Sequence, residues 1–501
     1  MSDQPAQTRS ILGDASRYTA ATYASQLGSF VTGLVTKGLL GPTNVGLWSL
    51  LNISLGYLAG VQLGAGDAVA KEVPYLRAKG DSPTADRLGG AMLGFVLLAS
   101  TIVGVGVVAI AFWNWARMSS ALRVGLLVVG LSFPVWMWVN MQTMVLRAAK
   151  RFDVLSRQLL LQLGVTAAIG IPLIWRFSLS GQYAVFLVAL AASFLYLRRA
   201  VVSDPNTRFR ARLDGEALRR LLAIGVPMQL AGLVFTFQST ADSLLAARSL
   251  GVTALGYYSL AVTVKGYVYQ TPNAFSVVMF PRFQERFGGS QDDPMALRNY
   301  VEKPIMAFAF AILPVLIGAS WQVVPFLVRH FLPSFVPAIP AIKILLGGTF
   351  FASLWHMPGQ FLIAINKLWH YVGYAATGAG LVALTVAFAL WWRPSIEAVA
   401  ASTGVAYTVT FLLITGYAVS HFRPIGGVLV FLLEVVAAGV ALFALLIIAD
   451  RLVPAASSLG PDLRNLIARS ALLAVAAWPL LWRADRILNL RAYLPWKRSS
   501  V

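Results

Sequence analysis

The residues best placed to do chemistry are a few cations that lie within long apolar segments. Lys265 is about twelve residues into such a segment, a depth of about 18 Å at 1.5 Å per residue. An ionisable side chain at that depth costs several kcal/mol unless it faces water or an opposite charge. Lys37, Arg248 and Lys343 lie nearer the ends of their segments, where snorkelling to the interface is the alternative. We predict that these cations line a cavity that binds an anion.

One carboxylate, that of Asp242, lies in the apolar segment that precedes the one with Lys265. Two roles are open for it. In the first, Asp242 is a site for a coupling ion or a proton, or a partner that releases Lys265 when cargo binds. In the second, Asp242 and Lys265 form a permanent salt bridge that organises this half of the chain, and Lys265 is structural as well.

Uncharged polar side chains lie near these charges and in two other apolar segments. Tyr258 and Tyr269 share one helical face with Lys265, at spacings of seven and four residues. We expect Pro272 to interrupt the same helix and free backbone carbonyl groups. For the amides, cavity lining and interhelical hydrogen bonds are both open. These amides are Gln26, Asn52 and Gln238.

Several kinds of site are not expected. The four histidines have no metal-ligand spacing, so we predict no metal site. Gly64-Ala65-Gly66 lacks the Lys-Ser/Thr of a phosphate-binding P-loop. The chain has no cysteine, which removes thiol catalysis and disulfides. The formal charge of +20 is spread over short loops between apolar segments, so we expect no nucleic-acid binding.

The elements that position these residues are predicted to be membrane-spanning helices. The 501 residues are 58% hydrophobic and 12% charged, about half the charged fraction of a soluble domain. Apolar runs of about 20 residues are long enough to span a bilayer. We predict an all-α polytopic membrane protein with about 14 transmembrane helices. They are expected at residues 15–40, 44–69, 88–113, 120–147, 154–176, 182–200, 219–248, 253–280, 303–323, 336–365, 369–392, 396–420, 425–449 and 464–484.

The distribution of lysine and arginine predicts the orientation. Loops on one side hold a roughly threefold excess of these residues over loops on the other side. By the positive-inside rule, both termini are expected in the cytoplasm. The longest polar connection, between the sixth and seventh spans, is then cytoplasmic.

An internal repeat predicts how the spans are grouped. Leu40 to Leu50 and Leu250 to Leu260 share leucine, glycine, threonine, aromatic and serine positions in register. The turn Ala148 to Arg151 resembles Ala364 to Lys367. Repeats of this kind typify transporters with a site between their halves, here related by an axis along the membrane normal. We predict an N-terminal lobe (1–200), a linker (201–218), a C-terminal lobe (219–422), and two appended spans with a cytoplasmic tail (423–501).

These motifs resemble the Wzx-type oligosaccharide flippases. That family lies in the multidrug/oligosaccharidyl-lipid/polysaccharide (MOP) exporter superfamily, with MurJ and the MATE drug antiporters. The resemblance covers nearly the whole chain, although its motifs are loose. It rests on Asp242, Leu250-Gly251, Gly256-Tyr257-Tyr258, Phe280-Pro281, Leu40-Gly41-Pro42, Gly46-Leu47-Trp48 and Val73-Pro74.

The resemblance implies two six-helix lobes around a V-shaped central cavity worked by alternating access, with two appended helices. It implies that the cargo is an undecaprenyl-pyrophosphate-linked oligosaccharide, flipped from the cytoplasmic to the outer leaflet of a bacterial inner membrane. The cations named above would then bind the diphosphate. The sugar contacts would come from Gln26, Asn52, Gln238, Tyr258 and Tyr269.

The same resemblance sets expectations about other molecules. No cofactor is expected, and the coupling ion is H+ or Na+. We expect a monomer that works beside a polysaccharide polymerase and other glycan-assembly proteins. The alternative function is a MATE-like cation-coupled drug antiporter, which would favour acidic rather than basic cavity residues. An enzyme acting on the same lipid carrier is not expected, because the predicted outer loops are short.

Overall fold

The computed structural model describes residues 4–204 and 207–488, which contain helices and no strand. This confirms the all-α prediction. Residues 1–3 and the end of the predicted cytoplasmic tail, residues 489–501, lie outside the described residues. The described chain packs as two compact units: unit 1 ends at Thr236 and unit 2 begins at Phe237. The boundary falls inside one long helix, α7 (Gly215–Leu250).

The helices have the following bounds. Those that begin in unit 1 are α1 (Gln4–Leu58), η1 (Ala59–Gln62), α2 (Ala65–Ala78), α3 (Ser82–Trp113), α4 (Ser120–Ala148), α5 (Phe152–Val165), η2 (Thr166–Gly170), α6 (Ile171–Val202) and α7 (Gly215–Leu250). Those of unit 2 are α8 (Val252–Gly289), η3 (Pro294–Leu297), α9 (Arg298–Ala307), η4 (Phe308–Ile312), α10 (Leu313–Phe331), η5 (Pro333–Ala338), α11 (Ile339–Leu354), α12 (His356–Ala364), α13 (Leu368–Trp392), α14 (Ile396–Val419), α15 (Ile425–Leu452), α16 (Leu459–Ala476) and α17 (Trp478–Leu488).

Eleven helical stretches of the described residues are long and apolar enough to cross a membrane. Two of them contain a kink, at Gly41 and at Ser178, where the backbone leaves the helical region. The long helix α8 is more polar and is not among the eleven. Each unkinked stretch, each half of the two kinked stretches, and α8 correspond to one of the 14 spans expected from sequence. The predicted fold class is therefore confirmed. One detail is wrong: α8 runs through Pro272 without interruption.

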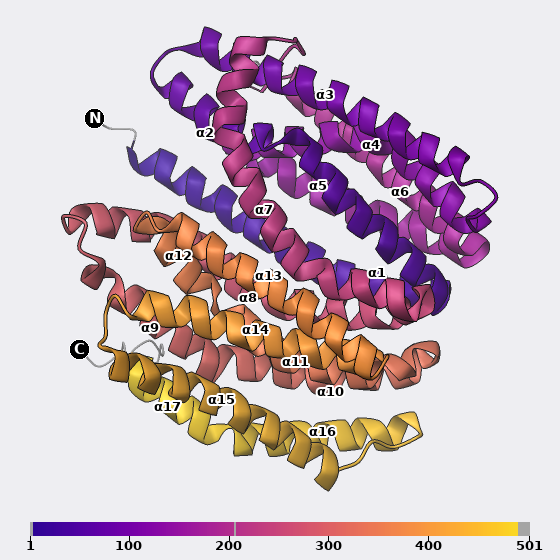
Figure 1. The fold of residues 1–501 in the computed structure, drawn as a ribbon, viewed down its shortest axis with the longest axis vertical. Helices are drawn as coiled ribbons and strands as arrows, with labels where there is room; N and C mark the ends of the chain where they lie inside the picture. The colour runs from indigo at the N-terminus through magenta and orange to yellow at the C-terminus, as the bar shows by residue number, and fades with distance from the viewer. Residues whose placement is uncertain (1–3, 205–206, 489–501) are drawn as a thin grey trace. The chain divides into compact units, whose positions relative to one another are not determined.

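The internal repeat has the same backbone geometry in both copies. Gly41 has φ 72° and ψ 167°, and Gly251 has φ 87° and ψ 174°. This region is open essentially to glycine alone, because a Cβ atom would collide with the backbone. In each copy the glycine ends one long helix and starts the next. Figure 1 shows the indigo chain of α1 turning back at this point.

The second repeated turn is also the same in both copies. Lys150 and Asn366 have φ of 58° and 60°. The next residue, Arg151 or Lys367, donates its N–H to the carbonyl oxygen five residues earlier, at 2.9 and 2.7 Å. This is the Schellman motif, which satisfies the free carbonyl groups at the end of a helix. The sequence similarity of the two turns therefore reflects a shared way of ending α4 and α12.

Glycine pairs bring helices into backbone contact within each unit. In unit 1 a Cβ on Gly104 of α3 would lie 2.5 Å from the carbonyl oxygen of Gly130 of α4. In unit 2 a Cβ on Gly348 of α11 would lie 2.4 Å from the Cα of Gly404 of α14. Membrane helices associate through such small residues, because lipid supplies no hydrophobic drive between them. These contacts fix the α3–α4 and α11–α14 pairs, which run side by side in Figure 1.

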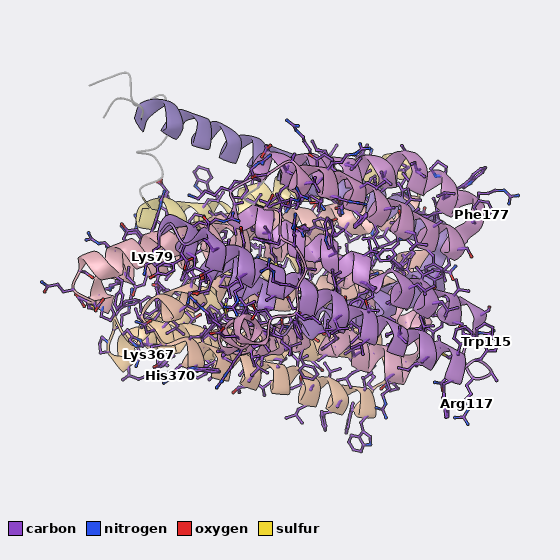
Figure 2. The ribbon with its side chains drawn as sticks, turned by 90° about the horizontal axis from the view of Figure 1, so that it is seen from above. Lys79, Trp115, Arg117, Phe177, Lys367 and His370 are labelled. Carbon is purple, nitrogen blue, oxygen red and sulfur yellow. The ribbon has the colours of Figure 1, made fainter. Side chains whose placement is uncertain are left out.

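Unit 1 carries different side chains at its two ends. Figure 2 shows Lys79 at one end and Trp115, Arg117 and Phe177 at the other. Trp113 is 90% exposed beside them. Exposed tryptophans near helix ends are typical of the membrane–water interface. The two ends of unit 1 are therefore suited to the two interfaces of a bilayer.

Candidate functional site

Two deeply buried charges of unit 2 lie on α7 and α8. The side chain of Asp242 is fully buried, with 0% exposure. Its Oδ2 accepts a hydrogen bond of 2.7 Å from the hydroxyl of Tyr258, and its Oδ1 accepts bonds from the N–H and hydroxyl of Ser243, at 2.6 and 3.2 Å. A buried carboxylate needs such donors to offset the loss of water. Local hydrogen bonds therefore hold Asp242 in place.

Lys265 lies beside this carboxylate and is only 8% exposed. Its Nζ donates to the hydroxyl of Tyr407 at 3.0 Å and to the backbone oxygen of Ser239 at 3.5 Å. The distance from Nζ to Oδ2 of Asp242 is 3.9 Å, within an ion pair but beyond a hydrogen bond. An ammonium has three donors, so one N–H remains for a further acceptor. The arrangement holds a cation in place and can still bind an anion or a sugar oxygen.

Aromatic side chains from α14, from the α11–α12 junction and from α8 itself lie around the ammonium. Nζ of Lys265 lies 5.3 Å from the centre of the Tyr407 ring, in the geometry of a cation–π contact. Trp355, at the junction of α11 and α12, packs edge-on against Tyr407 at 5.5 Å. Tyr269 of α8 lies against His356, with ring centres 4.4 Å apart. We call the residues Asp242, Ser243, Tyr258, Lys265, Tyr269, Trp355, His356 and Tyr407 the Lys265 cluster.

Two buried polar atoms on the border of this cluster have no hydrogen-bond partner among the described residues. They are Nε2 of His356 and Nε2 of Gln238, which lies one turn before Asp242. Each unsatisfied buried group costs about 1–3 kcal/mol. Native proteins keep few such groups, and those they keep call for a water, an ion or a functional role. The border of the Lys265 cluster is thus suited to a polar ligand.

Of the predicted site residues, the structure brings together Asp242, Tyr258, Lys265 and Tyr269, with Gln238 next to them. Lys343 lies elsewhere in unit 2, where its Nζ contacts Oδ2 of Asp450 at 2.5 Å and the Trp321 ring at 5.1 Å. Arg248 is exposed at the end of α7.

The remaining predicted residues lie in unit 1. Lys37 and Gln26 are half-buried on the first half of α1. Asn52 is exposed on the second half and donates its amide to the carbonyl oxygen of Trp48 at 2.8 Å. Intrahelical bonding of this kind leaves the Asn52 oxygen available to another donor.

Sequence reasoning missed Tyr407, His356 and Trp355. A signal for Tyr407 was present in the sequence, because Thr403 and Thr410 lie one turn to either side of it and all three side chains are buried. A polar stripe of this kind in an apolar helix indicates a face turned toward other protein groups.

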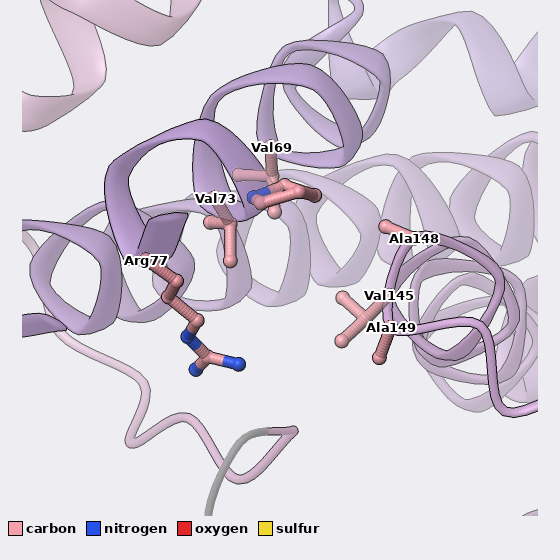
Figure 3. A pocket seen from close by; sticks show the side chains of 7 residues that line it. Val69, Val73, Arg77, Val145, Ala148 and Ala149 are labelled. Carbon is pink, nitrogen blue, oxygen red and sulfur yellow. The ribbon is translucent and has the colours of Figure 1, made fainter. Parts of the chain in front are cut away.

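Two hollows in the structure are mainly apolar. In unit 1 a cavity of about 70 Å³ lies between α2 and α4, and Figure 3 shows Arg77 on one side of it and Val145 and Ala149 on the other. In unit 2 an open groove of about 610 Å³ runs between α11, α14 and α15. Four glycines are among the residues that line it: Gly347, Gly348, Gly404 and Gly439. Its size and lining suit a hydrocarbon chain rather than a polar molecule.

The chain is similar to known proteins in both sequence and fold. A family model described as "Polysaccharide biosynthesis protein" matches residues 91–334, just under half of the chain. The lipid II flippase MurJ in an inward closed conformation has a TM-score of 0.68 and 12% identity, over 94% of this chain and 99% of that chain.

Two structures of a multidrug resistance MATE-family transporter of the MOP superfamily, one inward-facing and one outward-facing, are also similar. The inward-facing one has a TM-score of 0.61 and 14% identity, over 79% of this chain and 95% of that chain. The outward-facing one has a TM-score of 0.56 and 14% identity, over 85% and 96%. No curated protein sequence matches the chain. The chain has the fold of these MurJ and MATE transporters, as the resemblance drawn from sequence implied, and is a multi-pass membrane protein.

Proposed function

We propose that this protein is a flippase that moves an undecaprenyl-pyrophosphate-linked oligosaccharide from the cytoplasmic to the outer leaflet. The observation that carries the proposal is the buried ammonium of Lys265, which has one carboxylate at 3.9 Å and a free donor. A cation held in an apolar unit is costly unless it faces water, pairs with an opposite charge or binds a ligand, and the one carboxylate here lies beyond hydrogen-bond distance. A diphosphate is a ligand with the charge and the acceptors that it needs.

The surroundings of Lys265 support a glycan as the rest of the cargo. Tyr269, Trp355 and Tyr407 offer ring faces and hydroxyls, and Gln238 offers a buried amide. Such groups bind sugar rings and their hydroxyls. The apolar groove between α11, α14 and α15 supports a polyprenyl chain, because it offers hydrocarbon contacts on the outside of unit 2. The family match to polysaccharide biosynthesis proteins agrees with this class of cargo.

The proposal extends to the setting in which transport occurs. The protein acts as a monomer in the bacterial cytoplasmic membrane, with both termini in the cytoplasm. It needs no cofactor and performs no chemical step. Proton or Na+ movement supplies the drive, and Asp242 is the carboxylate that binds the coupling ion or releases Lys265. A polysaccharide polymerase and other glycan-assembly proteins are its functional neighbours.

The test is transport of a fluorescent lipid-diphosphate oligosaccharide in proteoliposomes. We compare the parent with Lys265→Ala, Lys265→Arg and Lys303→Ala, the last of which removes an exposed lysine outside the cluster. We expect Lys265→Ala to abolish transport, Lys265→Arg to keep part of it, and Lys303→Ala to match the parent. Full transport by correctly folded Lys265→Ala would refute the role of this cation. Export of organic cations by a parent that moves no lipid would establish a drug antiporter instead.

A further inference from the structure

The connection between α6 and α7 lies as an extended strap over the first turns of α3; we use "the strap" for residues 207–214. Three glycines of α3 make room for it, because Cβ atoms at Gly89, Gly90 and Gly94 would collide with strap atoms at 2.2–2.5 Å. The N–H of Arg212 donates to the carbonyl oxygen of Gly90 at 3.1 Å. The strap is therefore a fixed part of unit 1.

The strap presents alternate residues to opposite sides. Thr207 and Phe209 are buried against unit 1, and the guanidinium of Arg77 lies 5.6 Å from the centre of the Phe209 ring. Arg208 and Arg210 are exposed on the other side. With Arg212 they line a cavity of about 320 Å³, whose remaining walls include Asp86, Val202 and Ser203.

The arginines of this cavity differ in their pairing from several arginines around them. Four arginines of unit 1 have carboxylate partners: Arg77 with Asp86, Arg87 with Asp214 and Glu216, Arg151 with Asp153 and Asp204, and Arg220 with Glu72. The side chains of Arg208, Arg210 and Arg212 form no ion pair with any carboxylate of the described residues. The one acid in the cavity wall, Asp86, is already neutralised by Arg77.

We propose that this cavity is a binding site for a phosphate or diphosphate group, held by Arg208, Arg210 and Arg212. Guanidinium groups bind phosphate oxygens through paired, charge-assisted hydrogen bonds, and their fixed planar shape suits that geometry. The three residues line one cavity, and their backbone is already held on α3. Binding therefore costs little backbone conformational entropy. A lipid headgroup and a soluble phosphate compound share this chemistry. The site lies in unit 1, and its assignment does not depend on which cargo is transported.

The test uses the purified full-length protein in two arms. In the first, radiolabelled inorganic diphosphate is titrated onto protein in phosphatidylcholine nanodiscs. In the second, native mass spectrometry counts the phosphatidic acid that stays bound after mild delipidation. The variant Arg208→Gln/Arg210→Gln/Arg212→Gln removes the site. The matched control, Arg282→Gln/Arg286→Gln/Lys303→Gln, removes the same charge from exposed residues of unit 2.

We expect the strap variant to bind at least about tenfold more weakly than the parent, because it loses three charge-assisted contacts, while the control binds like the parent. Binding in the diphosphate arm alone identifies a soluble phosphate compound as the ligand. Retention of phosphatidic acid, with or without diphosphate binding, identifies a lipid headgroup. The proposal is overturned if the parent binds in neither arm, or if the strap variant and the control weaken binding equally.

Discussion

Asp242→Asn is the most informative single change in the Lys265 cluster. It keeps the shape of the side chain and removes its charge, so that the buried ammonium of Lys265 loses its counter-charge. Two unit charges 3.9 Å apart interact by about 4 kcal/mol at an effective dielectric constant of about 20. Breaking a buried pair from one side costs about 3–5 kcal/mol. Because Lys265 keeps its bond to Tyr407, we expect a loss near the lower end, about 3 kcal/mol.

The assay is thermal unfolding in detergent, followed by the fluorescence of the 14 tryptophans. A loss of about 3 kcal/mol corresponds to a fall in melting temperature of roughly 6–12 °C for a unit of this size. Lys265→Met and the double variant complete a thermodynamic cycle, and we expect the double variant to recover part of the loss. Glu434→Gln is the control, because its partner Arg483 is exposed and such surface pairs contribute about 1 kcal/mol or less.

Two results would contradict this reasoning. A fall of less than about 2 °C for Asp242→Asn would mean that the carboxylate does not stabilise the buried ammonium. Strict additivity of the two single changes would mean that the contact at 3.9 Å carries no coupling energy. Either result would leave Lys265 held by the Tyr407 hydroxyl and the Ser239 carbonyl oxygen alone.

Three further predictions concern other parts of the chain. Gly348→Val should cost about 1–3 kcal/mol by forcing α11 and α14 apart, measured by the same unfolding assay; an unchanged melting temperature would refute the close contact. Asp462→Asn should expose α16 to limited proteolysis, because buried Arg469 loses a partner at 3.4 Å; unchanged digestion would show that the ion pairs do not hold α16. The hydrogen bonds from Arg87 lower the pKa of the Asp214 carboxyl, so the stabilisation that this ion pair gives the strap is complete above the unfolded pKa of about 4 and is lost as pH falls through the lower folded value. The protection factors of the strap amides, which are corrected for the intrinsic pH dependence of exchange, should fall only below about pH 4. In Asp214→Asn these protection factors should not change with pH.

The parts of the fold that could be predicted are those in which the backbone itself limits the residue type. A glycine is required at Gly41 and Gly251 because of their positive φ, and the requirement was visible as a repeated motif. The course of α8 through Pro272 was not predictable, because a proline removes one hydrogen bond but membrane helices tolerate it when neighbours satisfy the freed carbonyl. The sequence shows that Pro272 lacks an N–H, but it does not show which neighbouring groups satisfy the freed carbonyl.

The site shows the same division. Tyr258 and Lys265 lie on one helix, and their spacing of seven residues alone predicts that they share a face of it. Asp242 lies on the preceding helix and contacts both of them. Tyr407 and His356 reach the cluster from α14 and α12, more than ninety residues further along the sequence than Lys265. Their contacts depend on how α8, α11 and α14 pack. The close approach of Gly348 and Gly404 sets part of that packing. Two glycines in separate helices do not show, in the sequence, that they will pack against each other.

Lys265 and the partly buried Lys343 of unit 2 differ in how their charges are balanced. The charge of Lys343 is neutralised by a carboxylate from the appended helices. Asp450 of α15 contacts both Lys343 and Arg469, and it accepts a hydrogen bond from Trp321 at 2.8 Å. The two carboxylate oxygens of Asp450 therefore contact two cations and one indole N–H, and these contacts join α10, α11, α15 and α16. Around Lys265 there is one carboxylate, and it is already bonded to Tyr258 and Ser243. An added anion would compete with a short ion pair at Lys343, whereas at Lys265 it would meet a donor that no carboxylate has engaged. This difference supports the proposal that Lys265 binds the ligand, and we propose a structural role for Lys343.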